Sequence, residues 1–179
     1  MVGRPDHEAV VETLQRLYGI LEARGLEIIL DDVTCKLLRA ESQKSHTRRD
    51  VVSACDLVIV VGGDGTMLQV AKHVAREQVP VIGVNRGRLG FLTDILPEEL
   101  EQRIEQVLAG EFIVEHRFLL DLYKKSAAGD EQKGTALNDV VLHPGKAAQM
   151  IAFELFVDGT FVCSEEADGL IVATPTGST

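Results

Sequence analysis

The chain has 179 residues, of which 45% are hydrophobic and 26% are charged, and its formal net charge is −10. This length and apolar fraction are typical of a folded chain with one or two domains. The excess of 28 acidic over 18 basic residues argues against a general nucleic-acid-binding or anionic-membrane-binding surface. No apolar run reaches the roughly 18 residues that a membrane-spanning helix needs.

The cysteines and histidines indicate neither a disulfide framework nor a zinc site. The three cysteines (Cys35, Cys55 and Cys163) form no CxxC pair, and the five histidines are not paired at metal-ligand spacing. Cysteine usage of this kind suits a reducing compartment, so we expect a cytoplasmic protein. Aromatic residues make up only 4% of the chain, which argues against an aromatic stacking surface.

Helices and strands are predicted to alternate up to Gly110. Apolar residues at helical spacing predict a helix from Asp6 that stops before Gly25. Further strands are predicted at 26–30, 57–61 and 80–84, and further helices at 48–54, 66–77 and 97–108. The uninterrupted apolar run at 57–61 is typical of a strand that is buried on both faces.

After Gly110 only strands are predicted, at 112–124, 135–143, 150–157, 161–164 and 170–173. Asp158-Gly159 lies between two of them and is a strong hairpin signal. The change of pattern predicts an α/β domain with a mostly parallel sheet over residues 1–115 and an antiparallel β-rich domain over residues 116–179. The chain stops on a polar turn where a helix would follow, so we expect the second domain to be incomplete.

A glycine loop, Gly62-Gly63-Asp64-Gly65-Thr66, joins the strand at 57–61 to the next helix. This order is typical of a phosphate loop, in which glycines allow close approach and positive φ while helix N–H groups bind an anion. The loop is neither a Walker A loop nor a dinucleotide fingerprint. Asp64 would repel a phosphate unless it binds a metal or takes a proton from a hydroxyl, which favours phosphoryl transfer. The alternative is a tight turn in which Asp64 caps the helix.

Three further segments place polar residues beside predicted strands. Residues 85–93 should emerge at the same sheet edge as Asp64, where ligands of open α/β sheets bind; the alternative is a structural loop with solvated arginines. Asn138-Asp139 suits paired ribose hydroxyls, or is ordinary strand-edge polarity. Asp168-Gly169 and residues 174–179 bracket a strand, and they either contact a base or phosphate or form a turn and a helix cap.

Four segments together resemble the NAD kinase family, whose members phosphorylate NAD to NADP with ATP. They are the glycine loop, residues 85–94 (NRGRLGFLTD), residues 137–145 (LNDVVLHPG) and residues 168–179 (DGLIVATPTGST). A lone GGDGT also occurs in diacylglycerol-, sphingosine- and phosphofructokinase-type enzymes, but the later three segments in this order are specific to NAD kinases. The resemblance implies an α/β domain of the NAD kinase and diacylglycerol kinase type, followed by a β-rich NAD-binding domain.

The resemblance also implies roles for individual residues. Asp64 matches the base that takes the proton from the 2′-hydroxyl of the adenosine ribose, and Phe91 matches an apolar neighbour of the adenine. Asn138 and Asp139 match the pair that holds the ribose hydroxyls. In the glycine loop, Gly62, Gly63 and Gly65 match nucleotide contacts. Asp168 matches the acid near the nicotinamide carboxamide, and Thr176 and Thr179 match polar contacts on the adenine side. Gln149 and Glu166 fall at positions where family members vary but often touch the ligand.

We therefore expect an NAD kinase that transfers the γ-phosphoryl group of ATP to the ribose 2′-hydroxyl of NAD. Mg²⁺ or another divalent cation is expected with ATP near Asp64, without a dedicated protein metal site. The resemblance implies a homo-oligomer, dimer or tetramer, for the full-length enzyme, and no nucleic-acid or membrane partner. The alternatives are a lipid kinase of the diacylglycerol type and a non-catalytic nucleotide-binding fragment. These 179 residues alone are expected to have weak or no kinase activity.

Overall fold

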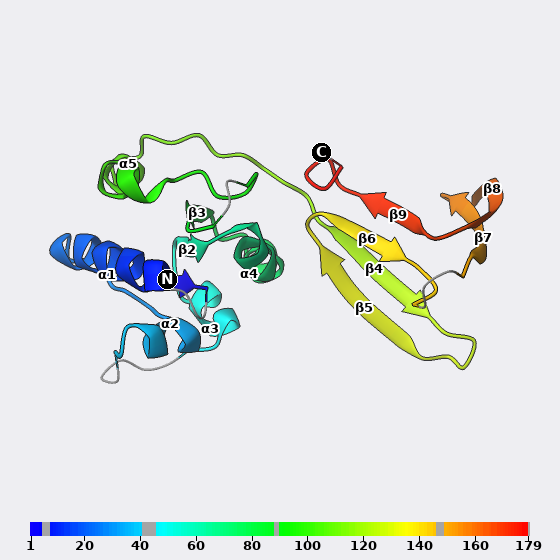
Figure 1. Cartoon of the computed structure of the whole chain (residues 1–179), viewed down its shortest axis with the longest axis horizontal. Coiled ribbons are helices and arrows are strands. Elements are labelled where there is room, and N and C mark those ends of the chain that lie inside the picture. Colours follow the sequence, from blue (N-terminus) through cyan, green and yellow to red (C-terminus); the bar gives the residue numbers. More distant parts are fainter. Residues whose placement is uncertain (5–7, 41–45, 88–89, 146–148, 179) are drawn as a thin grey trace. The chain divides into compact units, whose positions relative to one another are not determined.

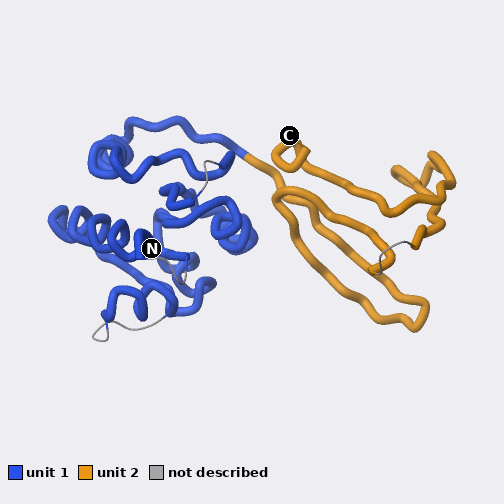
Figure 2. The backbone as a smooth tube through the Cα atoms, in the orientation of Figure 1, with its two compact units in different colours: residues 1–116 blue, residues 117–179 orange. Residues whose placement is uncertain are grey.

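The structure is a computed structural model that describes residues 1–4, 8–40, 46–87, 90–145 and 149–178. The chain divides into two compact units, Met1–His116 and Arg117–Thr179, coloured blue and orange in Figure 2. Within the described residues, all helices belong to the first unit, and the second unit contains strands only (Figure 1). The predicted fold class, an α/β part with a parallel sheet followed by an antiparallel β-rich part, is confirmed.

A three-stranded parallel sheet forms the centre of the first unit, in the order β1 (Val2–Gly3), β2 (Val58–Gly62) and β3 (Val81–Asn85). All residues of β2 are buried, as its apolar run predicts. Gly62 and Asn85 are paired at the ends of β2 and β3, so the two loops that follow these strands begin side by side. The predicted meeting of these loops at one sheet edge is confirmed.

Helices pack on both faces of this sheet (Figure 1). They are α1 (Glu8–Ala23), α2 (Asp32–Leu37), α3 (Arg48–Ser53), α4 (Asp64–Glu77) and α5 (Leu100–Leu108), with a 3₁₀ turn, η1 (Pro97–Glu99), before α5. Ile59 and Val61 join the apolar cluster of α1 and α5, whereas Val58 and Val60 join the cluster of α3 and α4. Alternate side chains of a strand point to opposite faces, so β2 contributes to two cores.

Two features of the first unit differ from the sequence expectation. The strand predicted at 26–30 is absent: the Met1 amine donates to the Ile29 carbonyl (2.6 Å) and the Asp31 N–H donates to the Met1 carbonyl (3.3 Å), without a strand ladder. Beyond Met1 the Gly3 N–H donates to the hydroxyl of Thr34 at 2.8 Å instead, so the pairing does not continue along the chain. Helix α2 was not predicted, because six residues show no clear helical period. Its only local signal is Asp31, which caps it by accepting from the Thr34 N–H at 2.9 Å.

The second unit consists of three antiparallel strand pairs. They are β4 (Leu120–Lys125) with β5 (Glu131–Ala136), β6 (Asp139–Leu142) with β9 (Leu170–Ala173), and β7 (Ile151–Val157) with β8 (Thr160–Ala167). Asp158 and Gly159 turn between β7 and β8 with φ of 50° and 78°, which confirms the predicted hairpin.

The strands on either side of Leu137 and Asn138 are shorter than predicted. The single strand expected at 135–143 is two strands, because the chain changes partner from β4 to β9 at these two residues. Residues 112–119 are not a strand, and β4 begins only at Leu120, where its pairing with β5 starts. Within the described ranges no helix is long and apolar enough to cross a membrane.

Candidate functional site

Helix α4 starts directly after β2, at the glycine loop. Gly63 is the N-cap of α4, and no side chain caps this helix end. The Thr66 N–H donates to the Gly63 carbonyl at 2.9 Å, which leaves the N–H groups of Asp64 and Gly65 and the positive end of the helix dipole for an anion. The alternative interpretation, in which Asp64 caps the helix, is wrong: Asp64 is the first helical residue, and its carboxylate binds a different loop.

The glycines of this loop provide space rather than left-handed backbone. Gly62, Gly63 and Gly65 do not have positive φ, contrary to the expectation for a phosphate loop. A Cβ atom at Gly62 would lie 2.5 Å from Oγ1 of Thr66, so only glycine fits under that side chain. A Cβ atom at Gly63 or Gly65 would meet none of the described atoms within 4 Å. The backbone at the start of α4 therefore has room beside it for a phosphate.

The carboxylate of Asp64 accepts two backbone hydrogen bonds from the loop after β3. The Phe91 N–H donates to Oδ2 at 2.9 Å, and the Leu92 N–H donates to Oδ1 at 3.1 Å. A carboxylate has about four acceptor positions, so each oxygen keeps one for a hydroxyl or a metal ion. The Phe91 side chain is 73% exposed, so its ring is free to contact a ligand while its N–H is bound.

Arg86, at the start of the same loop, is tied to helix α1. Its guanidinium donates to the hydroxyl of Thr13 and lies 3.6 Å from the carboxylate of Glu12. Its backbone N–H donates to the Gly62 carbonyl at 2.8 Å, which joins the two loops. The expectation of solvated arginines is therefore wrong for Arg86, and Arg88 lies outside the described residues.

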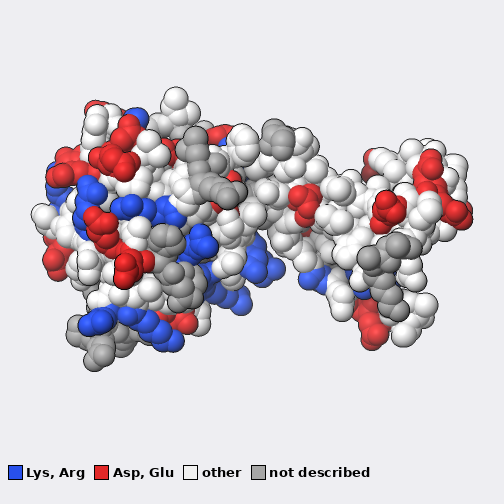
Figure 3. Space-filling view, viewed as in Figure 1, with Lys and Arg blue, Asp and Glu red and all other residues white. Residues whose placement is uncertain are grey.

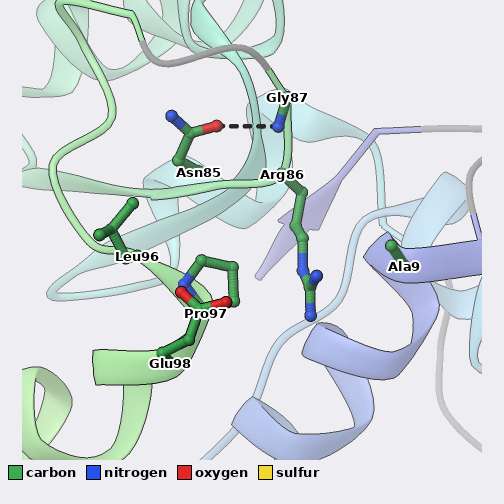
Figure 4. A pocket seen from close by; sticks show the side chains of 7 residues that line it. All are labelled: Ala9, Asn85, Arg86, Gly87, Leu96, Pro97 and Glu98. Carbon is green, nitrogen blue, oxygen red and sulfur yellow. Dashed lines mark hydrogen bonds between the residues drawn. The ribbon is translucent and has the colours of Figure 1, made fainter.

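A cavity of about 500 Å³ lies beside Arg86 in the first unit (Figure 4). It is lined by Ala9, Asn85, Arg86, Gly87, Leu96, Pro97 and Glu98. Figure 4 shows the hydrogen bond that Asn85 Oδ1 accepts from the Gly87 N–H at 2.8 Å, on one side of this cavity. Asn85, Arg86 and Gly87 belong to the predicted ligand-binding segment 85–93, but no residue to which the family resemblance gives a role lines the cavity, so we do not assign it to the candidate site.

In the second unit, Asn138 and the chain after β9 are brought together. The Thr174 hydroxyl, 1% exposed, lies 2.6 Å from the Leu137 carbonyl oxygen and 3.1 Å from that of Asn138. Gly177 packs so closely that a Cβ atom there would lie 2.3 Å from the Asn138 carbonyl oxygen. The side-chain Oδ1 of Asn138 is buried and accepts no hydrogen bond from the described residues. This acceptor suits a hydroxyl donor from a ligand.

The other predicted residues of the second unit are more loosely placed. Four of them are exposed: Asp139 lies at the start of β6, Gln149 before β7, Glu166 on β8 and Asp168 after β8. The Thr176 hydroxyl accepts from Arg117 at 3.2 Å. Thr179 lies outside the described residues. The structure therefore joins Asn138 to residues 174–177, and within its described part no contact brings the other four together.

The end of the chain is acidic and has no basic side chain. Residues 147–179 contain Glu154, Asp158, Glu165, Glu166 and Asp168 but no Lys or Arg. Figure 3 shows acidic side chains over the part of the second unit that carries β7 and β8. This segment offers no cationic side chain to a phosphate, so backbone N–H groups, cationic residues elsewhere or a bound cation must balance the charge of a nucleotide.

The described residues offer a divalent cation no ready-made cage. Among the residues that the structure describes, no three His, Cys, Asp or Glu side chains gather where they could hold a metal ion. Mg²⁺ is often held by one or two carboxylates together with substrate phosphates. Asp64, with one free acceptor position on each oxygen, fits that mode of binding.

Two family models match the chain. The ATP-NAD kinase N-terminal domain matches residues 1–112, and the ATP-NAD kinase C-terminal domain matches residues 137–179. The curated NAD kinases of Pseudomonas paraeruginosa and Pseudomonas putida are 52% and 51% identical to the chain over all 179 residues. The chain spans 61% and 60% of the length of these two relatives.

Solved structures agree with these matches. The crystal structure of yeast NADH kinase complexed with NADH has a TM-score of 0.87 and 26% identity, covering 99% of this chain and 57% of the yeast chain. The crystal structure of an NAD kinase from Archaeoglobus fulgidus in complex with ATP has a TM-score of 0.67 and 28% identity, covering 99% of this chain and 60% of the archaeal one.

Proposed function

The chain belongs to the ATP-NAD kinase family, and we propose that it carries the activity of an NAD kinase, with ATP as the phosphoryl donor and NADP as the product. The observation that carries this proposal is the Asp64 carboxylate, which is fixed beside an open glycine loop at the start of α4. A fixed proton acceptor next to backbone donors for phosphate is what phosphoryl transfer to an alcohol requires.

Asp64 acts as the general base in the proposed reaction. A sugar hydroxyl holds its proton strongly at neutral pH, so its attack needs an acceptor at hydrogen-bond distance. The ribose O2′ bonds to the γ-phosphorus while the bond to the β–γ bridging oxygen breaks. ADP leaves with that electron pair, and the hydroxyl proton passes to a free acceptor position on Asp64. The open backbone at Gly63 and Gly65, with the N-terminus of α4, binds phosphate oxygens.

A divalent cation bound with ATP would neutralise charge on the transferred phosphate oxygens. The acidic segment 147–179 increases the need for such a cation, because it supplies no Lys or Arg. We therefore propose that Mg²⁺ or a similar ion is required, and that removing it with a chelator abolishes phosphoryl transfer.

The remaining site residues have binding roles in this proposal. Asn138 and Asp139 hold the ribose hydroxyls, which is supported by the buried Asn138 oxygen that accepts no hydrogen bond from the described residues. The exposed ring of Phe91 contacts the adenine. Gly62, Gln149, Glu166, Asp168, Thr176 and Thr179 supply the further nucleotide contacts expected from the family.

We also propose a cytoplasmic, homo-oligomeric enzyme. The three cysteines are free, which suits a reducing compartment. The homo-oligomer is what the family resemblance implies for the full-length enzyme.

The proposal is tested by measuring NADP formation from NAD, ATP and Mg²⁺ with an NADP-specific dehydrogenase as reporter. The NAD kinase of Pseudomonas putida, 51% identical, serves as the positive reference in the same buffer. NADP that is formed by the full-length enzyme carrying this chain, and that is lost on adding a chelator, supports the proposal; the 179 residues alone are expected to form little or none.

Two other results contradict it. Phosphorylation of diacylglycerol without NADP formation would identify a lipid kinase, which the family matches do not favour. NAD binding in calorimetry, without NADP formation under conditions in which the reference enzyme is active, would identify a nucleotide-binding fragment.

A further inference from the structure

The position of Asp64 depends on a segment that lies far from it in the sequence. Both of its oxygens are bound by backbone N–H groups of Phe91 and Leu92, which lie 27 and 28 residues further along the chain. Two donors on two different oxygens fix the direction of the carboxylate plane as well as its place. A backbone donor of this kind cannot change rotamer, so the loop sets where the free acceptor positions point.

Gly90 is the residue that allows this arrangement. A Cβ atom at Gly90 would lie 2.3 Å from each oxygen of Asp64 and 2.4 Å from its Cγ, which is far inside van der Waals contact. In the same loop, Gly87 would place a Cβ atom no closer than 3.8 Å to any described atom outside its immediate neighbours. Space for the carboxylate is therefore specific to Gly90.

We propose that Gly90 is a positioning residue for phosphoryl transfer, because its missing side chain lets the Phe91 and Leu92 N–H groups hold the Asp64 carboxylate in place. The catalytic part of this inference rests on the proposed function, whereas the hydrogen-bonded arrangement itself does not. The same loop carries the Phe91 ring, so the arrangement also links the adenine contact to the position of the base. A displacement of about 1 Å at a reacting group can cost about 10²-fold in rate.

The first test is amide hydrogen exchange, read residue by residue by NMR in the nucleotide-free protein. In Gly90→Ala, the Phe91 and Leu92 amides are expected to exchange at least about tenfold faster than in the parent protein. In Gly87→Ala, which changes a glycine of the same loop without a close contact, they are expected to keep their protection. Unchanged exchange in Gly90→Ala would overturn the proposal, whether or not the protein is an NAD kinase.

Asp64→Ala supplies the reciprocal test and covers the case in which Gly90→Ala does not fold. The substitution removes both acceptors without adding bulk, so the same two amides are expected to lose their protection. Amides that stay protected in Asp64→Ala would show that another contact holds the loop, and would also overturn the proposal.

The catalytic part is read from kcat and KM for NADP formation. Gly90→Ala is expected to lower kcat by about 10²-fold while KM for NAD stays within several-fold, because the base is displaced but the nucleotide contacts remain. A rise in KM with unchanged kcat would mean that the loop serves binding alone and would contradict the positioning role.

Discussion

The strand that leads to Asp64 and the strands that carry Asn138 and Asp139 differ in what holds them. β2 is buried over its whole length between two apolar clusters, so the loop that follows it starts from a packed core. In the second unit, Leu137 is the one hydrophobic residue that is buried among those described, and isolated strand pairs of this kind are marginally stable in water. The comparison indicates that core packing positions the backbone that leads to Asp64, whereas hydrogen bonds and close backbone contacts alone position the backbone at Asn138.

The largest expected difference comes from the same truncation in each unit. Leu14→Ala removes a side chain that is fully buried in the first unit, which should lower the free energy of unfolding by about 2–5 kcal/mol. Leu142→Ala changes a side chain that is 51% exposed, and its effect should stay within about 0.5 kcal/mol. Hydrogen exchange of peptides from each unit in increasing urea measures both. Equal losses of unfolding free energy in the two variants would contradict the claim that core packing stabilises the first unit more than the second.

A buried ion pair in the first unit gives the next largest effect. Asp31 is fully buried, caps α2 and accepts from Nε of Arg48 at 3.1 Å. Asp31→Ala removes the cap and leaves Arg48 without its carboxylate, so the free energy of unfolding should fall by about 2–3 kcal/mol. The matched control is Asp32→Ala, at the exposed neighbouring carboxylate. Helical circular dichroism in a urea titration measures both variants, and a control that loses as much as Asp31→Ala would contradict a role for the pair.

Thr174 tests whether hydrogen bonds hold the second unit at Asn138. Thr174→Val keeps the shape of this buried side chain but removes the hydroxyl that contacts the Leu137 and Asn138 carbonyls. The local free energy of opening should fall by about 1–2 kcal/mol, measured from exchange of the Gly177 amide. Thr160→Val, at an exposed position at the start of β8, is the control. No change in Thr174→Val would mean that the strand pairing alone positions this segment.

The smallest effect concerns His73 on α4. Burial and the neighbouring charges of Lys72, Arg48, Arg76 and Arg49 lower the pKa of His73 below its ordinary value of 6.5. The unfolded chain therefore binds this proton more readily than the folded one. The contribution of His73 to stability is complete above pH 6.5 and is lost as the pH falls through 6.5 towards the lower folded pKa.

His73→Gln should remove this part of the pH dependence. Urea midpoints of the first unit, measured from pH 7.5 down to pH 5 in about half-unit steps, should fall less steeply in the variant than in the parent. Identical slopes would show that His73 is protonated with equal ease in both states.

Much of the first unit could be predicted from the sequence because its signals are local. The apolar run predicts β2, the helical period predicts α4, and the glycines between them predict the loop that carries Asp64. The partners of Asp64 could not be predicted, because Phe91 and Leu92 act through backbone N–H groups that leave no trace in residue type. The sequence does contain one sign of this contact: Gly90, in the loop after β3, directly precedes the two donor residues.

The second unit was harder to predict in detail. The alternating and apolar segments indicated strands, and Asp158-Gly159 indicated the hairpin, but the change of partner at Leu137 and Asn138 has no local signal. A strand pairs with a segment that lies far away in the sequence. The residues in a short window around the strand do not show which distant segment that partner is. For Thr174 the sequence therefore predicts either a ligand contact or part of a turn and helix cap, whereas its hydroxyl contacts the carbonyls of Leu137 and Asn138.

The most direct test of the central claim is phosphoryl transfer by Asp64→Asn. The amide keeps the shape of the side chain and one acceptor oxygen, but it cannot take the proton from the ribose hydroxyl. The rate of NADP formation should fall by about 10²-fold or more, while the dissociation constant for NAD, measured by calorimetry, stays within several-fold. An unchanged rate would contradict the assignment of Asp64 as the general base.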